Sequence, residues 1–311
     1  MVKKIYASLI ALIMIGFTLT TSVYAWFSVS RTGMIEGLEM GVGLDDDLML
    51  SLDGATYHKE LTNDMIIPYI GENPNLSSIT SSNGYEFYKG PISSAKAQVK
   101  SDYISFTIYF KVVSDNPNVD AHHKYVYLAN KRSPTYQDSN VKGTYITSQG
   151  KNWISPITFD NGSKIVNSGE SGMYYSKDAI RISAVDSSNQ LRFIYDPSNN
   201  PERGFGRTFG AYDYYQKRLG ISLDIPDDLP DVTNVLTQFS LLQDDIALEK
   251  VSLVEDLILV SNQAGVYEYR GFATINIWLE GWDADCFDSI LADSLKIKLS
   301  FKSARYNEVI D

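Results

Sequence analysis

The alternation of apolar and polar residues at a period of two is the strongest pattern along the chain. It is clearest over residues 103–113, and it recurs over residues 266–279 and 295–301. Successive side chains of a strand point to opposite faces, so each segment predicts a strand with one face toward a core. Amphipathic helices do not recur between these segments. The pattern therefore predicts an all-β fold, an antiparallel β-sandwich rather than alternating strands and helices.

Shorter segments add weaker strands and one or two short helices. One helix is expected at residues 211–219, and about two helical turns at residues 283–292. Residues 196–235 are rich in glycine, proline and asparagine and predict a long irregular insertion. Over residues 235–260 the pattern does not separate helix from strand. The other expected strands are residues 26–29, 38–42, 48–52, 65–69, 85–88, 124–129, 145–148, 179–185 and 191–195.

The first 25 residues have the three-part order of a secretory signal peptide. Two lysines precede an apolar run over residues 5–17, and the small residues Val23 and Ala25 follow. This order predicts a signal-peptide helix over residues 1–25 and cleavage between Ala25 and Trp26. The apolar run is shorter than the roughly 20 residues that span a bilayer, so membrane contact is expected only before cleavage. Processing after Gly16, as in type IV pilins, is the alternative.

We expect the remaining chain, residues 26–311, to form one elaborated β-sandwich domain. Its composition narrows the possible functions and partners. The formal net charge is −11, and the predicted signal peptide contains two lysines and no acidic residue, so its removal makes the charge more negative. The electrostatic field of a protein with this negative net charge repels nucleic acid and anionic membranes. Cys286 is the only cysteine, which excludes an intramolecular disulfide. Apolar neighbours such as Phe287 favour a buried, inert thiol over a reactive one.

Acidic clusters are the main candidates for metal binding. Outside the cell, carboxylates at high density can bind calcium, although solvated turns and helix capping explain such clusters equally simply. No zinc or hydrolase motif accompanies His58, His122 or His123, so we expect no enzyme and no cofactor other than calcium. A hydrolase with a carboxylate site that lacks a motif stays an alternative. The candidate ligands are Glu280, Asp283, Asp285 and Asp288, with Asp45, Asp46 and Asp47 as a second cluster.

Aromatic residues gather in the irregular insertion. Such rings give a large contact area at low entropic cost, which is typical of surfaces that bind a glycan or a protein. They could equally cover the end of the sheet. The members of this candidate binding patch are Phe205, Phe209, Tyr212, Tyr214 and Tyr215.

The start of the chain also resembles a known family. Residues 25–28 (Ala-Trp-Phe-Ser), 37–42 and 50–54 resemble the start of secreted Gram-positive proteins related to TasA and camelysin, and residues 278–286 resemble a stretch of related surface proteins. The resemblance implies a jelly-roll β-sandwich in a biofilm or surface fibre. It also implies cleavage before an aromatic residue and assembly by donor-strand exchange, in which the freed N-terminal segment completes the sheet of the next subunit. Camelysin's association with proteolysis is not carried over, because no protease motif is present.

Residues 26–43 are the expected assembly strand. Several glycines interrupt this apolar segment and deny it a stiff local structure, so after cleavage it could add to the exposed sheet edge of a neighbour. The alternative is that it forms the first strand of its own sandwich. The side chains expected to mediate assembly are Trp26, Phe27, Val29, Leu38, Met40 and Val42.

These expectations favour an exported, non-enzymatic structural protein of the cell surface or extracellular matrix. Its partners would be copies of itself or other surface proteins, and not nucleic acid. A secreted β-sandwich module that binds a glycan or a protein is the alternative.

Overall fold

The computed structural model divides into two units, Met1–Arg31 and Thr32–Asp311, and strands dominate the second. An all-β fold is therefore confirmed. The predicted signal peptide, the cleavage site and the expected strand at residues 26–29 lie outside the described residues, apart from Met14. The structure describes Met14 and residues 32–43, 47–72, 74–90, 95–115, 125–138, 140–198, 200–227, 230, 233–243 and 246–306.

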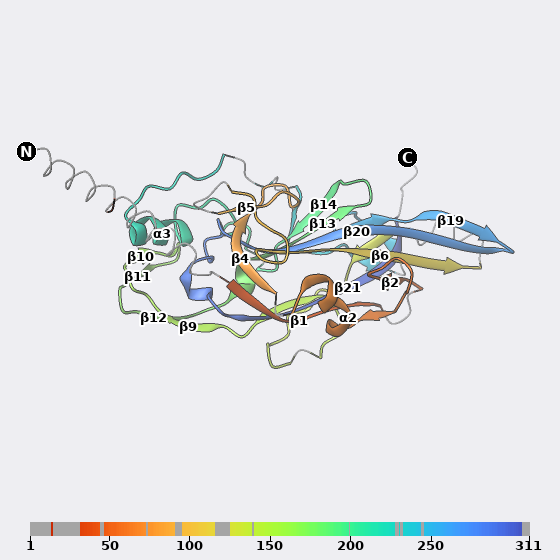
Figure 1. Ribbon diagram of the computed structural model, residues 1–311, viewed down its shortest axis with the longest axis horizontal. Coiled ribbons are helices and arrows are strands. Elements are labelled where there is room, and N and C mark those ends of the chain that lie inside the picture. Colours follow the sequence, from red (N-terminus) through yellow and green to blue (C-terminus); the bar gives the residue numbers. More distant parts are fainter. Residues whose placement is uncertain are drawn as a thin grey trace, which may run out of the picture. The chain divides into compact units, whose positions relative to one another are not determined.

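Four long strands form the framework, β1 (Thr32–Val42), β6 (Ile104–Ser114), β20 (Val266–Glu280) and β21 (Ser294–Tyr306) (Figure 1). The three strongest alternating segments of the sequence correspond to β6, β20 and β21. Strands β6 and β20 pair antiparallel over eleven residue positions, and the side chains of β6 alternate between buried and half-buried along most of its length. Alternation in the sequence thus identified strands with one face in the core.

Among the described residues, seventeen strands join in one hydrogen-bonded sheet, and two further pairs of strands stand apart from it. The separate pairs are β9 (Lys151–Ile154) with β12 (Ser171–Tyr174), and β10 (Phe159–Asp160) with β11 (Ile165–Val166). The shorter strands of the large sheet are β2 (Met49–Ser51), β3 (Glu60–Leu61), β4 (Asn75–Thr80), β5 (Tyr88–Lys89), β7 (Tyr125–Leu128), β8 (Tyr145–Ser148), β13 (Ile180–Asp186), β14 (Leu191–Tyr195), β15 (Val235–Leu236), β16 (Leu242–Gln243), β17 (Ile246–Ala247), β18 (Leu253–Asp256) and β19 (Ile258–Gln263).

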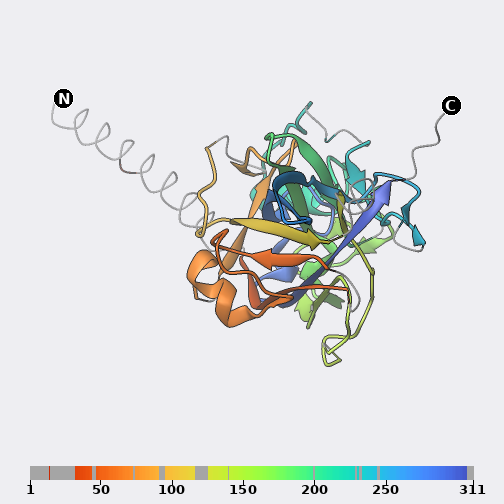
Figure 2. The same cartoon turned by 90° about the vertical axis from the view of Figure 1, so that its right-hand side faces the viewer.

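The sheet curls around one large core (Figure 2). Phe110 of β6 and Phe301 of β21 meet in this core with ring centroids 5.4 Å apart. Leu38 and Met40 of β1 also lie in it. Burial of such side chains contributes about 1.5–3 kcal/mol each to folding, so the contact between these strands is a principal source of stability.

The expectation of a purely antiparallel sheet is wrong. Strand β1 pairs parallel with β21, from Met34 beside Ser294 to Val42 beside Phe301. Parallel pairs also join β4 to β20, β14 to β15 and β17 to β21. Side chains alternate in the same way in parallel and antiparallel strands, so the pattern carried no information about strand direction.

In the part of the chain that the structure describes, helices are few and short. Helix α3 (Ala211–Leu219) has the predicted bounds. Helix α2 (Asn63–Ile70) replaces the strand predicted at residues 65–69, because Ile66 and Ile70 lie one turn apart on a single buried face. The helix expected at residues 283–292 is reduced to the 3₁₀ turn η3 (Asp288–Ile290), and another such turn is η2 (Ser176–Asp178). Residues 235–260, left open by the sequence, contain short strands.

Candidate functional site

Strand β1 contains the described part of the predicted assembly strand, and it belongs to the core of its own subunit. Leu38 and Met40 are fully buried, and Val42 packs against the same core. One edge of β1 pairs with β21, and its opposite edge pairs with β3 and β4. These three residues are therefore not free to add to a neighbour. The other predicted residues lie outside the described part of the chain: Ala25, Trp26, Phe27 and Val29. No helix among the described residues is long and apolar enough to cross a membrane.

The four acidic residues predicted to bind calcium have separate partners. Asp285 accepts two hydrogen bonds from Arg203, at 3.0 and 2.6 Å, and Asp288 accepts one from the Tyr214 hydroxyl at 2.8 Å. Asp283 pairs with Arg181. Among the described residues, no group of three or more histidine, cysteine, aspartate or glutamate side chains could bind a metal ion. Asp45 and Asp46 of the second cluster lie outside those residues.

Glu280, the fourth of these residues, is a buried structural acceptor. Its Oε2 accepts hydrogen bonds from Trp278 Nε1 at 3.0 Å and from the Ser81 N–H at 3.3 Å, and its Oε1 accepts one from the Trp282 N–H at 3.1 Å. Burial raises the pKa of Glu280, and these hydrogen bonds oppose that effect. Burial likewise raises the pKa of Asp283 well above its ordinary value, opposed by the charge of Arg181.

The predicted aromatic binding patch is mostly interior, which corrects the expectation. Tyr214 and Tyr215 are fully buried, because they project from α3 into a second core with Phe159 and Phe287. Phe205 and Tyr212 pack against the same cluster. Phe209 is half-buried, with the guanidinium of Arg203 5.6 Å from its ring centre. The rings therefore stabilise the insertion instead of forming an exposed surface.

A cavity of about 330 Å³ lies where the insertion meets the large sheet, and we call it the Asp196 cavity. Its walls are apolar at Ile194, Val235 and Trp278, and Phe205 of the predicted patch lines it as well. Arg181, Asp196, Glu280 and Arg207 are its charged residues. These residues are far apart in the sequence, so no local motif could have identified the cavity.

Arg181 is the central charge of this cavity. It is 4% exposed, and its charge acts on Asp196, Asp283 and Glu280. Gly204 lets the chain approach it closely, since an added Cβ would lie 2.8 Å from Arg181 Nη2. A buried guanidinium is tolerated only when its charge and its N–H groups have partners. The charge of Arg181 interacts with several carboxylates at once.

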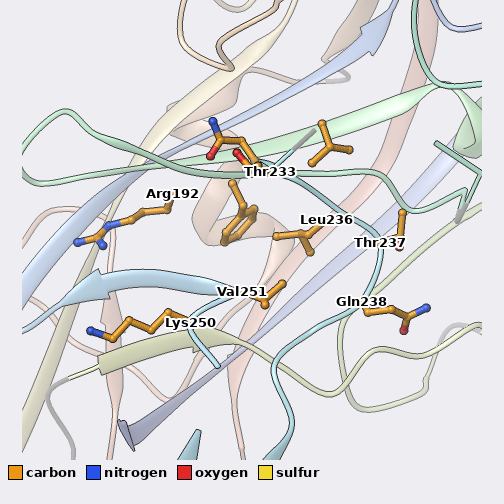
Figure 3. Close-up of a pocket in the computed structure, with 10 residues that line it drawn as sticks. Arg192, Thr233, Leu236, Thr237, Gln238, Lys250 and Val251 are labelled. Carbon is orange, nitrogen blue, oxygen red and sulfur yellow. The ribbon is translucent and has the colours of Figure 1, made fainter. Parts of the chain in front are cut away.

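A second cavity, of about 320 Å³, is lined by residues of β15 and of the segments around it (Figure 3). It shares Val235 and Thr237 with the Asp196 cavity. In Figure 3, Arg192 and Lys250 lie together on the side away from Thr237. Arg192 forms ion pairs with Asp186 and Asp256, so its charge is largely neutralised within the protein.

Strand β19 and a hollow beside it, which we call the β19 hollow, form an exposed apolar region of the large sheet. The hollow has a volume of about 410 Å³ and is lined by Ile258, Val260 and Phe272, with Asp53 and Asp256 among its polar residues. Ile258 is 67% exposed, Val260 49% and Phe272 41%. Sequence reasoning missed this edge, because it did not assign residues 235–260 to strands and because β19 does not alternate with polar residues.

Comparison of the chain with protein-family models, with curated proteins and with solved structures finds no match.

Proposed function

We propose that the protein is an exported, non-enzymatic structural component of a cell surface or extracellular matrix, and that it assembles by strand addition at β19. In this proposal the curled sheet is a jelly-roll sandwich, and residues 1–25 are removed during export. The acidic composition favours a protein partner over nucleic acid. The observation that carries the proposal is the exposed apolar edge of β19, which has no charged residue and no proline.

An edge strand presents unpaired backbone groups to other chains, and proteins usually protect such an edge with lysine, proline or a bulge. Strand β19 contains one bulge, between Leu259 and Ser261, but no charged residue and no proline. In the described part of the chain, β20 is the strand that pairs with it. Ile258, Leu259 and Val260 are exposed in succession. This edge has the properties of an acceptor for an added strand.

The donor that we propose is residues 26–31 of a neighbouring copy. Cleavage before Trp26 would leave these six residues ahead of β1, and β19 also has six residues. The donor contains Trp26, Phe27 and Val29, whose side chains suit the apolar side of the β19 hollow. Because donor and acceptor are different surfaces, the contact is heterologous and can propagate into an open fibre. Strand β1 itself stays in its own core.

The β19 hollow contains two carboxylates besides the cation Arg270, which is already paired with Glu268. Asp53 accepts hydrogen bonds from the Thr56 and Ala55 N–H groups and from Ser51, which hold its pKa well below the ordinary value and keep it ionised. Asp256 Oδ1 is shielded from solvent and has no hydrogen-bond partner. Cleavage would create an α-ammonium at Trp26, and these carboxylates are suitable acceptors for it.

The experiment compares the mature protein, beginning at Trp26, with two matched lysine variants. We expect the wild type to form polymers visible by electron microscopy and light scattering. Val260→Lys places a charge on the β19 edge and should abolish polymers. Ile154→Lys changes a 63% exposed residue of β9 and should leave them unchanged. Monomeric wild type, or polymers of Val260→Lys equal to those of wild type, would contradict the proposal.

A further inference from the structure

We propose that the Asp196 cavity binds a small molecule with a primary ammonium on a short apolar body, and most tightly one with a carboxylate at its other end. This inference does not depend on the proposed assembly, because the cavity and β19 are lined by different residues.

Asp196 Oδ2 has no hydrogen-bond donor, although Arg181 Nη2 lies only 3.2 Å away. A guanidinium Nη atom carries two hydrogens. Those of Arg181 Nη2 go to the Gly204 carbonyl and to Asp283 Oδ2, while Nη1 donates to the Ile180 carbonyl. The other oxygen of Asp196, Oδ1, accepts from the Ser198 N–H and hydroxyl. One carboxylate oxygen therefore has the charge of Arg181 beside it but accepts no hydrogen bond, in a side chain that is 1% exposed.

Such an open acceptor is costly unless a donor reaches it. A buried polar atom without a partner costs about 1–3 kcal/mol, and more when it is charged. The second carboxylate of the cavity does not compete for a ligand, because both oxygens of Glu280 already accept hydrogen bonds from Trp278, Ser81 and Trp282. Asp196 Oδ2 is thus the position at which a ligand N–H adds a hydrogen bond that the protein lacks. An ammonium supplies this bond together with a complementary charge.

The walls of the cavity define the body of the ligand. Ile194, Val235 and Trp278 are apolar surfaces around the acid, and Phe205 adds a ring. A volume of about 330 Å³ lies at the lower end of the range for small-molecule sites, which bind a mainly apolar body through a few fixed polar groups. A hydrated metal ion would leave these walls unused. An alkyl chain of a few carbons uses them.

Arg207 defines the far end of the ligand. It lines the cavity but is exposed, and its Nε donates to the Glu202 carbonyl. Its remaining N–H groups can bind a carboxylate at the entrance. A cationic far end would be repelled there. The geometry thus favours a zwitterion with its charges at opposite ends over a diamine.

The test uses isothermal titration of the full chain with three probes of similar length. These are 6-aminohexanoate, which has both charged groups, pentylamine, which has only the ammonium, and hexanoate, which has only the carboxylate. We expect 6-aminohexanoate to bind most tightly, pentylamine to bind more weakly, and hexanoate not to bind across the millimolar range. Binding of hexanoate equal to that of pentylamine, or no heat with either amine, would overturn the proposal.

Two variants assign the ends of the ligand. Asp196→Asn removes the open carboxylate and should weaken binding of both amines roughly tenfold to a hundredfold, with near-UV circular dichroism confirming that it is folded. Arg207→Ala changes an exposed side chain and is expected to fold normally. It should reduce the affinity for 6-aminohexanoate to that for pentylamine and leave pentylamine unaffected. If folded Asp196→Asn binds the amines as the wild type does, the assignment is wrong.

Discussion

Met40 of β1 and Leu299 of β21 lie side by side in parallel register, and both are almost completely buried. They join the first strand of the described fold to its last. This contact makes β1 an integral part of the sheet and limits any donor to the residues that precede it.

The first prediction concerns this strand. Met40→Ala should lower the free energy of unfolding by about 2–5 kcal/mol, because it leaves a cavity in the core. Met173→Ala, at a 54% exposed position of β12, should change it little. Urea unfolding followed by tryptophan fluorescence measures both. Removal of residues 26–43 should prevent folding. A shortened chain with wild-type stability would mean that β1 is dispensable.

The second prediction concerns Glu280→Gln. The amide cannot accept all three hydrogen bonds of the carboxylate, since its NH₂ must face at least one N–H group. We expect a loss of about 1–3 kcal/mol of unfolding free energy at neutral pH, measured by urea unfolding.

The same variant should alter the dependence of stability on pH. The folded pKa of Glu280 is raised above the ordinary value of 4.5, so the folded state binds this proton more tightly than the unfolded state. Its contribution is therefore complete below about pH 4.5 and is lost as the pH rises through the folded pKa. Glu280→Gln should make the decline with rising pH shallower, and an unchanged slope would contradict the pKa direction.

The third prediction compares two glycines at the ends of α3. Gly210 and Gly220 both have positive φ, +67° and +66°, but an added Cβ at Gly210 would lie 2.2 Å from the Ala284 carbonyl oxygen, whereas the space at Gly220 is open. Gly220→Ala should cost about 1–2 kcal/mol for the left-handed backbone alone. Gly210→Ala should cost about 1–3 kcal/mol more, because of the clash and because the ψ of Gly210, −124°, lies outside the left-handed helical region that Gly220 adopts. Equal losses in thermal unfolding would show that Gly210 is not held against Ala284.

The fourth prediction tests the interior position of the insertion's aromatic residues. Tyr214→Phe keeps the ring but removes the hydroxyl that donates to Asp288, and it should destabilise the protein by about 1.5–3 kcal/mol. Tyr85→Phe, at an exposed ring, serves as the control and should be neutral. If Tyr214→Phe is also neutral, the Asp288 contact contributes nothing measurable.

The local pattern of apolar and polar residues predicted the elements that have one buried face. Strand β6 alternates because one of its faces is buried and the other is half-buried along most of its length, whereas both faces of β20 are buried from Ile275 to Glu280. Helix α3 begins and ends at glycines. Residues 65–69, which lie in α2, were predicted as a strand, since a short apolar segment fits a strand and a buried helix equally well. The parallel pairing of β1 with β21 depends on residues more than 250 positions apart, which no local pattern reports.

The sites were harder to predict than the strands. Carboxylate density around Glu280 was visible in the sequence, but the arginines that pair with its neighbours, Arg181 and Arg203, come from other segments. Aromatic density in the insertion was visible too, but burial of Tyr214 and Tyr215 follows from how α3 packs. The Asp196 cavity and the β19 edge are products of tertiary structure and have no sequence motif.

Pulsed electron spin resonance on mixed subunits measures whether residues 26–31 of one copy lie along β19 of another. One batch of mature protein carries a nitroxide at Ser28→Cys and the other at Leu259→Cys, both with Cys286→Ser. Because paired strands lie about 5 Å apart, the account predicts distances below roughly 20 Å between the two labels in polymers and none in monomers. A label at Met173→Cys in place of Leu259→Cys should give no such distance. Polymers in which labels at residues 28 and 259 stay far apart would contradict strand addition at β19.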